Sequence, residues 1–293
     1  MKKAFLVGIN KYQTSSLRGC VNDVLLMYKI LSEKFNFNTN NIDIITDYQA
    51  TRENIIKGLK KLTFNLSYGD IIYFHYSGHG SQVVVKDWTN NSEPDGRDEI
   101  LCPIDLDWNT PLRDNDLKDI FINIPNGVKS TVVLDSCHSG TGLRNSNEII
   151  YVDPDTDPSK YAILNKYISP PISNMLENPL ISLDDDLNYI FPVENSKNIQ
   201  SIKNKFLIST TDQGNNILIS GCKDNQTSAD AYMGGRYHGA LTYSLVQSLI
   251  KKQFNIKYLE LVADINMILK NFGFQQEPQL EAKKEFFGNQ FLN

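Results

Sequence analysis

Short apolar runs alternate along the chain with longer stretches in which apolar residues recur every three or four positions. The short runs predict buried strands, and the longer stretches predict amphipathic helices. In the first half we expect strands at residues 3–9, 42–46, 70–76 and 131–134, and an edge strand at 100–104. Helices are expected at residues 18–35, from Thr51 to about residue 62, and at 114–121. Strands that alternate with helices predict a mostly parallel sheet with helices on both faces.

This pattern breaks down between about residues 145 and 204, where prolines and an acidic run at residues 184–186 interrupt short apolar pieces. A stretch of this length without periodicity is typical of a linker or a functional insertion. A strand is expected again at 205–210, then helices at 240–251 and 258–271 and an extended segment, QQEPQLEA. We therefore divide the chain into residues 1–144, a linker at 145–204, and residues 205–293, which complete a sheet of about six strands.

Composition places the chain among ordinary globular proteins. Its 293 residues are 41% hydrophobic and 22% charged, with a net charge of −5, so a sizeable core can form. The basic residues are scattered, which argues against a nucleic-acid or membrane partner. No apolar stretch approaches the ~20 residues that span a bilayer. The N-terminal apolar run ends at Ile9 without a small-residue cleavage site, so a secretory signal is not expected.

The cysteines and histidines do not form metal-binding patterns. The four cysteines lie far apart without a CxxC pair, and the four histidines show no spacing typical of a metal site. Both observations argue against a zinc site and against a disulfide framework. A reducing, cytoplasmic location is the simplest expectation. The cysteines are Cys20, Cys102, Cys137 and Cys222.

Two predicted strands end in small-residue turns that carry reactive side chains. Residues 129–142 read KSTVVLDSCHSGTG and place Cys137 after one strand, whereas His79 follows another within YSGHG. Parallel strands bring both turns to one edge of the sheet. An imidazole there can take the thiol proton and deliver it to a leaving amine. The amides of Gly80 and Cys137 can form an oxyanion hole. A cysteine without the second turn would more often be a small buried hydrophobic residue.

The other histidines are weaker candidates for the base. His75 lies inside a predicted strand and is expected to pack in the core. His138 adjoins Cys137, but neighbouring side chains of an extended segment point to opposite faces. His238 is expected to begin a helix after the linker and has no motif around it. We therefore expect His79 to be the partner of Cys137.

The chain resembles the caspase-like cysteine peptidases, and among them the metacaspases. The resemblance runs nearly end to end through FLVGINKY, LRGCVND, YFHYSGHGSQ, DEILCPID, VVLDSCHSG, ISGCKDNQTSADA, GALTYSL and QEPQL. Asp-Ser-Cys stands where animal caspases have Gln-Ala-Cys. The resemblance implies a caspase-like three-layer α/β sandwich with p20-like and p10-like parts. It also implies a thiol endopeptidase in which His79 and Cys137 form the dyad through a thioacyl intermediate.

The resemblance further implies a pocket for the residue before the cleaved bond, P1. The positions that match this S1 pocket are Cys20, Asp23, Ser77 and Asp135. Two carboxylates would pair with a substrate Arg or Lys, so proteins or peptides with a basic P1 residue are the expected partners. Asp23 could instead be a charge that suits a helix N-terminus. A peptidase that prefers Asn or Asp at P1, and an inactive adaptor of the same fold, remain alternatives.

The chemistry itself needs no cofactor, but the resemblance makes calcium a candidate activator. Asp114 and Asp116 match the family's aspartates before the helix that precedes the cysteine strand, and Asp95 and Asp98 lie in the acidic loop before them. Dense carboxylate oxygens suit calcium. Where the family often supplies a further Asp after the CHSG turn, this chain has Arg144. A solvated acidic loop with an N-cap at Asp114 is an equally open interpretation.

The linker predicts how the peptidase activity is regulated. An enzyme that cleaves after basic residues and carries a long linker beside its cleft is expected to be a zymogen, activated by its own cleavage or by an upstream protease. The alternative is a linker that only connects the two halves and never enters the cleft. The candidate self-cleavage residues are Arg144, Lys160, Lys166, Lys197, Lys203 and Lys205.

Overall fold

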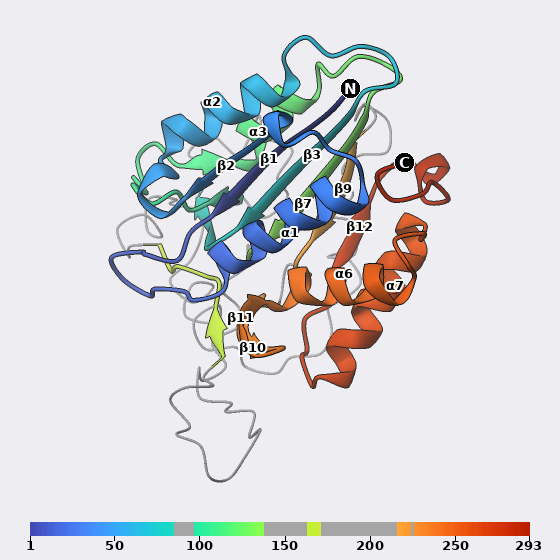
Figure 1. Cartoon of the computed structure of the whole chain (residues 1–293). Helices are drawn as coiled ribbons and strands as arrows, with labels where there is room; N and C mark the ends of the chain where they lie inside the picture. The colour runs from blue at the N-terminus through green and yellow to red at the C-terminus, as the bar shows by residue number, and fades with distance from the viewer. Residues whose placement is uncertain (85–96, 138–162, 171–215, 224–225) are drawn as a thin grey trace, which may run out of the picture.

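The computed structural model describes residues 1–84, 97–137, 163–170, 216–223 and 226–293 (Figure 1). In this part of the chain, six strands form a central sheet in the order β12-β9-β7-β3-β1-β2. They are β1 (Lys2–Gly8), β2 (Ile42–Thr46), β3 (Ile71–Ser77), β7 (Lys129–Asp135), β9 (Asn216–Ser220) and β12 (Gln279–Glu281). The pairs are parallel except that of β12 with β9. This mostly parallel sheet is the one expected for a caspase-like α/β fold.

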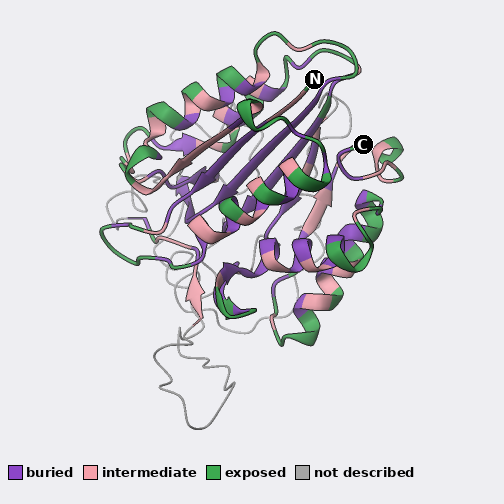
Figure 2. Ribbon diagram, in the orientation of Figure 1, coloured by how far each residue is buried: buried purple, intermediate pink, exposed green. Residues whose placement is uncertain are grey.

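Helices cover both faces of the sheet and make three layers. On one face lie α1 (Cys20–Lys34), α6 (Ala240–Lys251) and α7 (Tyr258–Asn271), and on the other lie α2 (Arg52–Thr63) and α3 (Asp114–Phe121). We call the two hydrophobic clusters the α6-side cluster and the α2-side cluster. Alternate residues of β1 divide between them, because Leu6 packs in the first and Phe5 in the second. Figure 2 shows the buried strands between helices whose outer faces are exposed.

Several predicted boundaries are confirmed closely. The helices α3, α6 and α7 have the expected limits, and Thr51 caps α2 by accepting a hydrogen bond from the Asn54 amide at 3.2 Å. None of the helices in the described residues is both long and apolar enough to span a bilayer. The limits of helices were therefore predicted best where apolar residues recur periodically and a capping residue marks the start.

Two strand predictions need correction or fall outside the structure. The expected edge strand at residues 100–104 is instead β5 (Arg97–Leu101), which pairs with β4 (Gly80–Val84) and β6 (Leu112–Arg113) in a separate antiparallel sheet. The strand expected at 205–210 lies outside the described residues. The place beside β7 is taken by β9, whose sequence NILIS is too short to stand out from apolar runs nearby.

A third small sheet closes the second half of the chain. It contains β8 (Leu164–Asn165), β10 (Ala229–Met233) and β11 (Arg236–Gly239), in the order β11-β10-β8. β10 and β11 form a hairpin that leads directly into α6. β8 comes from the region assigned to the linker and pairs antiparallel with β10. Part of the linker is therefore built into the fold.

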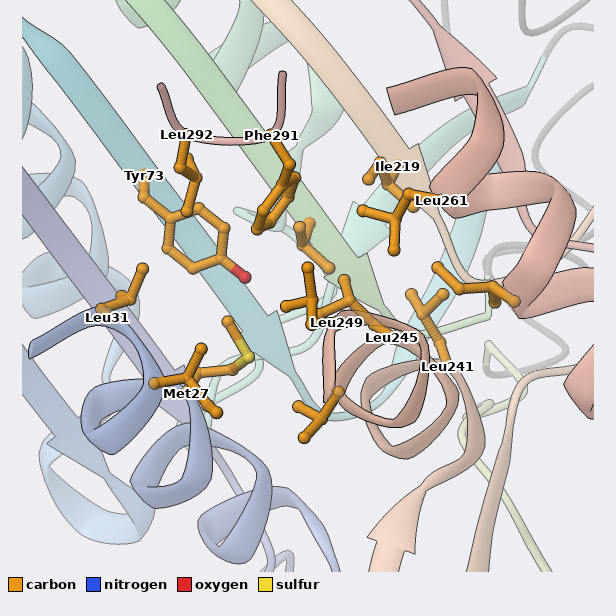
Figure 3. Close-up of a cluster of buried hydrophobic side chains, with 14 of the residues drawn as sticks. Met27, Leu31, Tyr73, Ile219, Leu241, Leu245, Leu249, Leu261, Phe291 and Leu292 are labelled. Carbon is orange, nitrogen blue, oxygen red and sulfur yellow. The ribbon is translucent and has the colours of Figure 1, made fainter. Parts of the chain in front are cut away.

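The C-terminal end of the chain returns to the middle of the α6-side cluster. Phe291 and Leu292 are each 1% exposed, and Figure 3 shows them beside Tyr73 on the sheet. The Phe291 ring lies edge-on to Tyr258 and Phe35, with centroids 5.3 and 5.5 Å away. These contacts attach the end of the chain to α1, α7 and the central strands at once.

We predict that Phe291→Ala lowers the free energy of unfolding by about 3–5 kcal/mol, because it leaves a cavity in a close-packed cluster. Denaturant titration followed by circular dichroism measures this change. Phe64→Ala is the matched control, since Phe64 is 73% exposed and its loss should cost less than about 1 kcal/mol. Equal effects of the two substitutions would contradict the packing.

Candidate active site

The two reactive turns leave the sheet side by side. β3 and β7 are parallel neighbours whose last pair joins Ser77 to Asp135. His79 and Cys137 each follow two residues later, so both lie at the carboxyl edge where the sequence predicted them. Both residues are fully buried. The parallel register thus accounts for their approach across a long separation in sequence.

His79 is oriented through one ring nitrogen. Its Nε2 lies 2.6 Å from the carbonyl oxygen of Ser15 and donates to it. Its Nδ1 is buried and has no hydrogen-bond partner in the described part of the structure. Burial lowers the pKa of His79 to about 4, against the opposing effect of the Ser15 and Lys166 backbone. The ring is therefore neutral near pH 7, with Nδ1 as the free base.

The loop that carries Ser15 is itself fixed at its base. The amides of Arg18 and Gly19 donate to Oδ2 of Asp230 in β10, at 2.6 and 3.1 Å. Tyr12, near the start of the same loop, accepts a hydrogen bond from the His79 amide at 2.9 Å. The position of the His79 ring thus depends on the second half of the chain as well as on β3.

Two backbone amides converge on one carbonyl oxygen. The N–H groups of Gly80 and Cys137 lie 2.9 and 3.3 Å from the carbonyl oxygen of Lys166. A Cβ at Gly80 would lie 2.0 Å from the Cys137 carbonyl oxygen, so this close approach requires glycine. Two donors directed at one carbonyl oxygen have the arrangement expected of an oxyanion hole. The Cys137 Sγ accepts a hydrogen bond from the Ser228 amide at 2.6 Å.

The ammonium group of Lys166 lies in a buried acidic pocket. Its Nζ is 2.9 Å from Oδ1 of Asp135 and 3.7 Å from Oδ2 of Asp23, and it donates to Oγ of Ser77 at 2.9 Å. Cys20 lies beside Ser77, and burial raises the pKa of its thiol well above the usual value. The structure thus brings all four predicted pocket residues together around one lysine.

The charges in this pocket stabilise one another. Burial alone would lower the pKa of Lys166, but Asp135, Cys20 and Asp23 raise it further than burial lowers it. Burial would raise the pKa of Asp135, but Lys166 and Thr242 together lower it below its usual value. A buried carboxylate needs such partners, because its desolvation is costly. Lys166 and Asp135 therefore form a charged ion pair inside the pocket.

Sequence reasoning missed the residues that hold these carboxylates. Oδ2 of Asp135 accepts from the amide and hydroxyl of Thr242 at 2.9 and 2.7 Å, and Oδ1 accepts from the Ser228 hydroxyl at 2.9 Å. Thr242 lies in the first turn of α6, where backbone amides lack helical partners. Thr242 lies in GALTYSL, one of the motifs that carry the resemblance, but the motif alone does not show that Thr242 binds Asp135.

His238, a weaker candidate for the base, contacts a carboxylate of the predicted pocket. Its Nδ1 lies 3.0 Å from Oδ1 of Asp23, and the next amide, of Gly239, donates to Oδ2 of Asp23 at 2.9 Å. His238 lies at the end of β11 and not in a helix. Asp23 and His238 lie far apart in the sequence, so no local pattern indicates this contact. It joins the first half of the chain to the second. His75 is fully buried, as expected for a core residue.

The candidate calcium residues are engaged with basic groups. Asp98 pairs with Nη1 of Arg113 at 2.5 Å. Oδ2 of Asp116 accepts from the Arg113 amide at 3.0 Å and from Arg52 at 3.2 Å. Burial, with Asp98 nearby, raises the pKa of Asp114 to about 6. The N-cap of α3 is Arg113, so an N-cap at Asp114 was wrong.

Within the described ranges, no group of three or more His, Cys, Asp or Glu side chains could hold a metal ion. The calcium site stays a prediction, because Asp95 of the predicted ligand set lies outside the described residues. Of the candidate cleavage residues, the structure places Lys166. The other predicted residues outside the described ranges are Asp95, His138, Arg144, Lys160, Lys197, Lys203 and Lys205.

Comparison with known proteins finds similarity over nearly the whole chain. Residues 2–146 match the family model of the metacaspase peptidase C14 domain. Metacaspase-1 of Debaryomyces hansenii is 34% identical over 96% of this chain and 64% of its own length. Metacaspase-1 of Schizosaccharomyces pombe is 32% identical over 96% of this chain and 67% of its own length. The chain therefore spans about two thirds of these relatives.

The fold is also similar to a solved structure. A crystal structure of a protein from Geobacter sulfurreducens aligns with a TM-score of 0.62 and 25% sequence identity. The alignment covers 100% of this chain and 98% of that chain.

We predict that His79 remains neutral between pH 5 and 8, with the proton on Nε2, because its pKa is about 4 and Nε2 faces a carbonyl. Nitrogen NMR of the full chain labelled at histidine measures both the tautomer and the titration. The same protein unfolded in urea is the control, where histidine should titrate near pH 6.5. A protonated Nδ1, or a titration near 6.5 in the folded chain, would refute this geometry.

Proposed function

The chain belongs to the metacaspase family of caspase-like cysteine peptidases, and on this basis we propose that it cleaves peptide bonds after Lys or Arg, including the bond after Lys166 in its own linker. The observation that carries the proposal is the placement of Lys166. Its side chain fills the acidic pocket while its carbonyl oxygen faces the amides of Gly80 and Cys137. A P1 residue poised for attack needs both contacts at once.

The proposed chemistry uses the residues already described. Nδ1 of His79 takes the proton of the Cys137 thiol, and the thiolate attacks the carbonyl carbon of the P1 residue. The amide of Ser228 donates to Sγ, and Sγ donates to the Ser228 carbonyl oxygen, so both contacts hold the sulfur in place. Charge on the carbonyl oxygen is stabilised by the two backbone amides. His79 then protonates the leaving amine, and water hydrolyses the thioacyl enzyme.

The proposed preference for a basic P1 residue follows from charge. Two buried carboxylates, Asp23 and Asp135, would face the P1 side chain. An Asp at P1 would add a third negative charge, and an Asn would leave both without a counter-ion. Lys or Arg supplies that charge and several donors. An inactive adaptor is the less supported alternative, because the oxyanion-hole amides and the base are both placed around a peptide carbonyl.

The same contacts support the proposal that the uncut chain is a zymogen. While Lys166 fills the pocket, another P1 residue cannot enter it. Cleavage after Lys166, by the enzyme itself or by an upstream protease, would let this segment leave. A linker that never enters the cleft does not agree with the position of residues 163–168.

We also propose calcium as an activator. The carboxyl of Asp114 beside Asp98 fits a cation, because a cation would favour the charged form of Asp114. Asp116 would first have to release Arg52. Calcium would therefore act on the loop before α3, while the chemistry at Cys137 proceeds without a metal.

We predict that the purified chain converts to fragments of residues 1–166 and 167–293 that stay associated, because both contribute strands to the central sheet. Intact-mass spectrometry with size-exclusion chromatography measures this, with calcium and with EGTA in parallel. Cys137→Ala should remain whole, and Lys166→Gln should lose this cut while Lys166→Arg retains it.

The matched control for this experiment is Lys29→Gln, which changes an exposed lysine of α1 and should process like the parent. A parent chain that hydrolyses Lys peptides but stays at full length would refute self-cleavage and leave the peptidase assignment intact. Cleavage of Cys137→Ala only by an added protease would indicate activation by another enzyme.

We predict that Asp135→Asn lowers kcat/KM for Lys and Arg peptides by roughly 30-fold or more, because loss of one partner of a buried charge pair costs about 2–5 kcal/mol. Fluorogenic peptides that end in Lys, Arg, Asn or Asp measure the preference. Asp43→Asn is the control, since Asp43 forms an exposed pair with Lys61. Faster cleavage after Asn or Asp by the parent enzyme would overturn the proposed pocket.

A further inference from the structure

The chain on the leaving-group side of Lys166 is held as closely as the chain before it. Tyr167 forms a parallel bridge with Gly80, and the Ile168 amide donates to the Gly80 carbonyl oxygen at 3.2 Å. The Gly80 amide donates in turn to the Lys166 carbonyl. A single residue therefore makes hydrogen bonds on both sides of the bond between Lys166 and Tyr167.

Side chains at alternate positions of this segment face the protein. An extended chain places residues two apart on the same side, so Leu164, Lys166 and Ile168 share a face. Lys166 enters the acidic pocket, while Leu164 and Ile168 pack against the α2-side cluster. Relative to the bond after Lys166, these residues are P3, P1 and P2′.

A buried hydroxyl also binds the leaving-group side. Oγ of Ser81 donates to the carbonyl oxygen of Ile168 at 2.5 Å. Ser81 is fully buried in β4, opposite Ile100 of β5. The mechanism proposed above does not use this side chain. The hydrogen bond from Ser81 holds the P2′ residue, which neither the acidic pocket nor the oxyanion-hole amides contact through its carbonyl oxygen.

From these contacts we propose a second recognition site on the leaving-group side, in which Gly80 and Ser81 bind the backbone of the P2′ residue and the border of the α2-side cluster binds an aliphatic side chain. The proposal rests on the peptidase function proposed above and deepens it. The substrate class is an extended polypeptide segment with an aliphatic residue at P3, a basic residue at P1 and an aliphatic residue at P2′.

This site has a physical role in the reaction. Hydrogen bonds to Gly80 on both sides of the scissile bond fix the register of the peptide, so the P1 carbonyl cannot slide away from the two amides. Binding energy from Ile168, which does not react, helps to hold the reacting atoms. Removal of a methylene group from a hydrophobic pocket typically lowers kcat/KM by tenfold or more.

The test uses the enzyme after cleavage at Lys166, with both fragments present, and quenched fluorescent octapeptides with the sequence of residues 162–169, AILNKYIS. We expect the Ile168→Gly peptide to be cleaved with a kcat/KM about tenfold lower than that of the parent peptide. The matched control is the Asn165→Ala peptide, which changes the opposite face of the segment and should stay within about threefold. Mass spectrometry of the products verifies that each cut follows the lysine.

A variant enzyme provides a second measurement. We compare kcat/KM for the octapeptide with that for a short Lys-aminocoumarin substrate, which has no P2′ residue. In Ser81→Ala the ratio of the two values should fall about fivefold relative to the parent enzyme. Because the peptide series uses the parent enzyme, the proposal is tested even where this variant does not fold.

The outcomes separate the two proposals. If the Lys peptides are cleaved equally well with Ile or Gly at P2′, the leaving-group site is overturned and the peptidase function stands. If no Lys or Arg peptide is cleaved, the proposed function fails and the site fails with it. A loss confined to the Ile168→Gly peptide and to the Ser81→Ala ratio supports the site.

Discussion

The buried carboxylates of Asp23 and Asp135 are the constraint on which the arrangement of the site depends. Both are fully excluded from water, so each needs hydrogen-bond donors and a positive charge nearby. The donors come from distant parts of the chain, namely Ser77 at the end of β3, Gly239 and Thr242 at the start of α6, and Ser228 before β10. The N-terminal amides of α6 also place the positive end of a helix dipole at these charges. The two halves of the chain are joined at this point by electrostatics as much as by apolar packing.

The same constraint links specificity to the fold. A Cβ at Gly239 would lie 2.1 Å from Oδ2 of Asp135 and 2.3 Å from Nζ of Lys166, so the backbone itself forms a wall of the pocket. His238, on the residue before, binds Asp23 on its other side. A substitution that moves the start of α6 would therefore change the pocket and the join between the halves together.

The sequence was sufficient for the parts of the structure that depend on local pattern. The strand-end turns of His79 and Cys137 were predictable because parallel strands place their carboxyl ends at one edge. The helices were predictable from apolar spacing and from caps such as Thr51. Ser228, His238 and Thr242 could not be predicted from pattern alone, since each acts through a tertiary contact with a carboxylate more than ninety positions away. Ser15 was hidden for another reason, because it acts through its backbone carbonyl, which any residue type carries.

The pairing of β8 with β10 has a consequence for what can reach the nucleophile. When residues 164–165 leave, one side of β10 becomes an open edge with unsatisfied amide and carbonyl groups. A helix already satisfies its own backbone groups, so it cannot complete that edge. An extended segment with free backbone groups can do so. The local fold of a target protein therefore decides which of its segments can bind, before any side chain is recognised. Loops, tails and partly unfolded segments can bind.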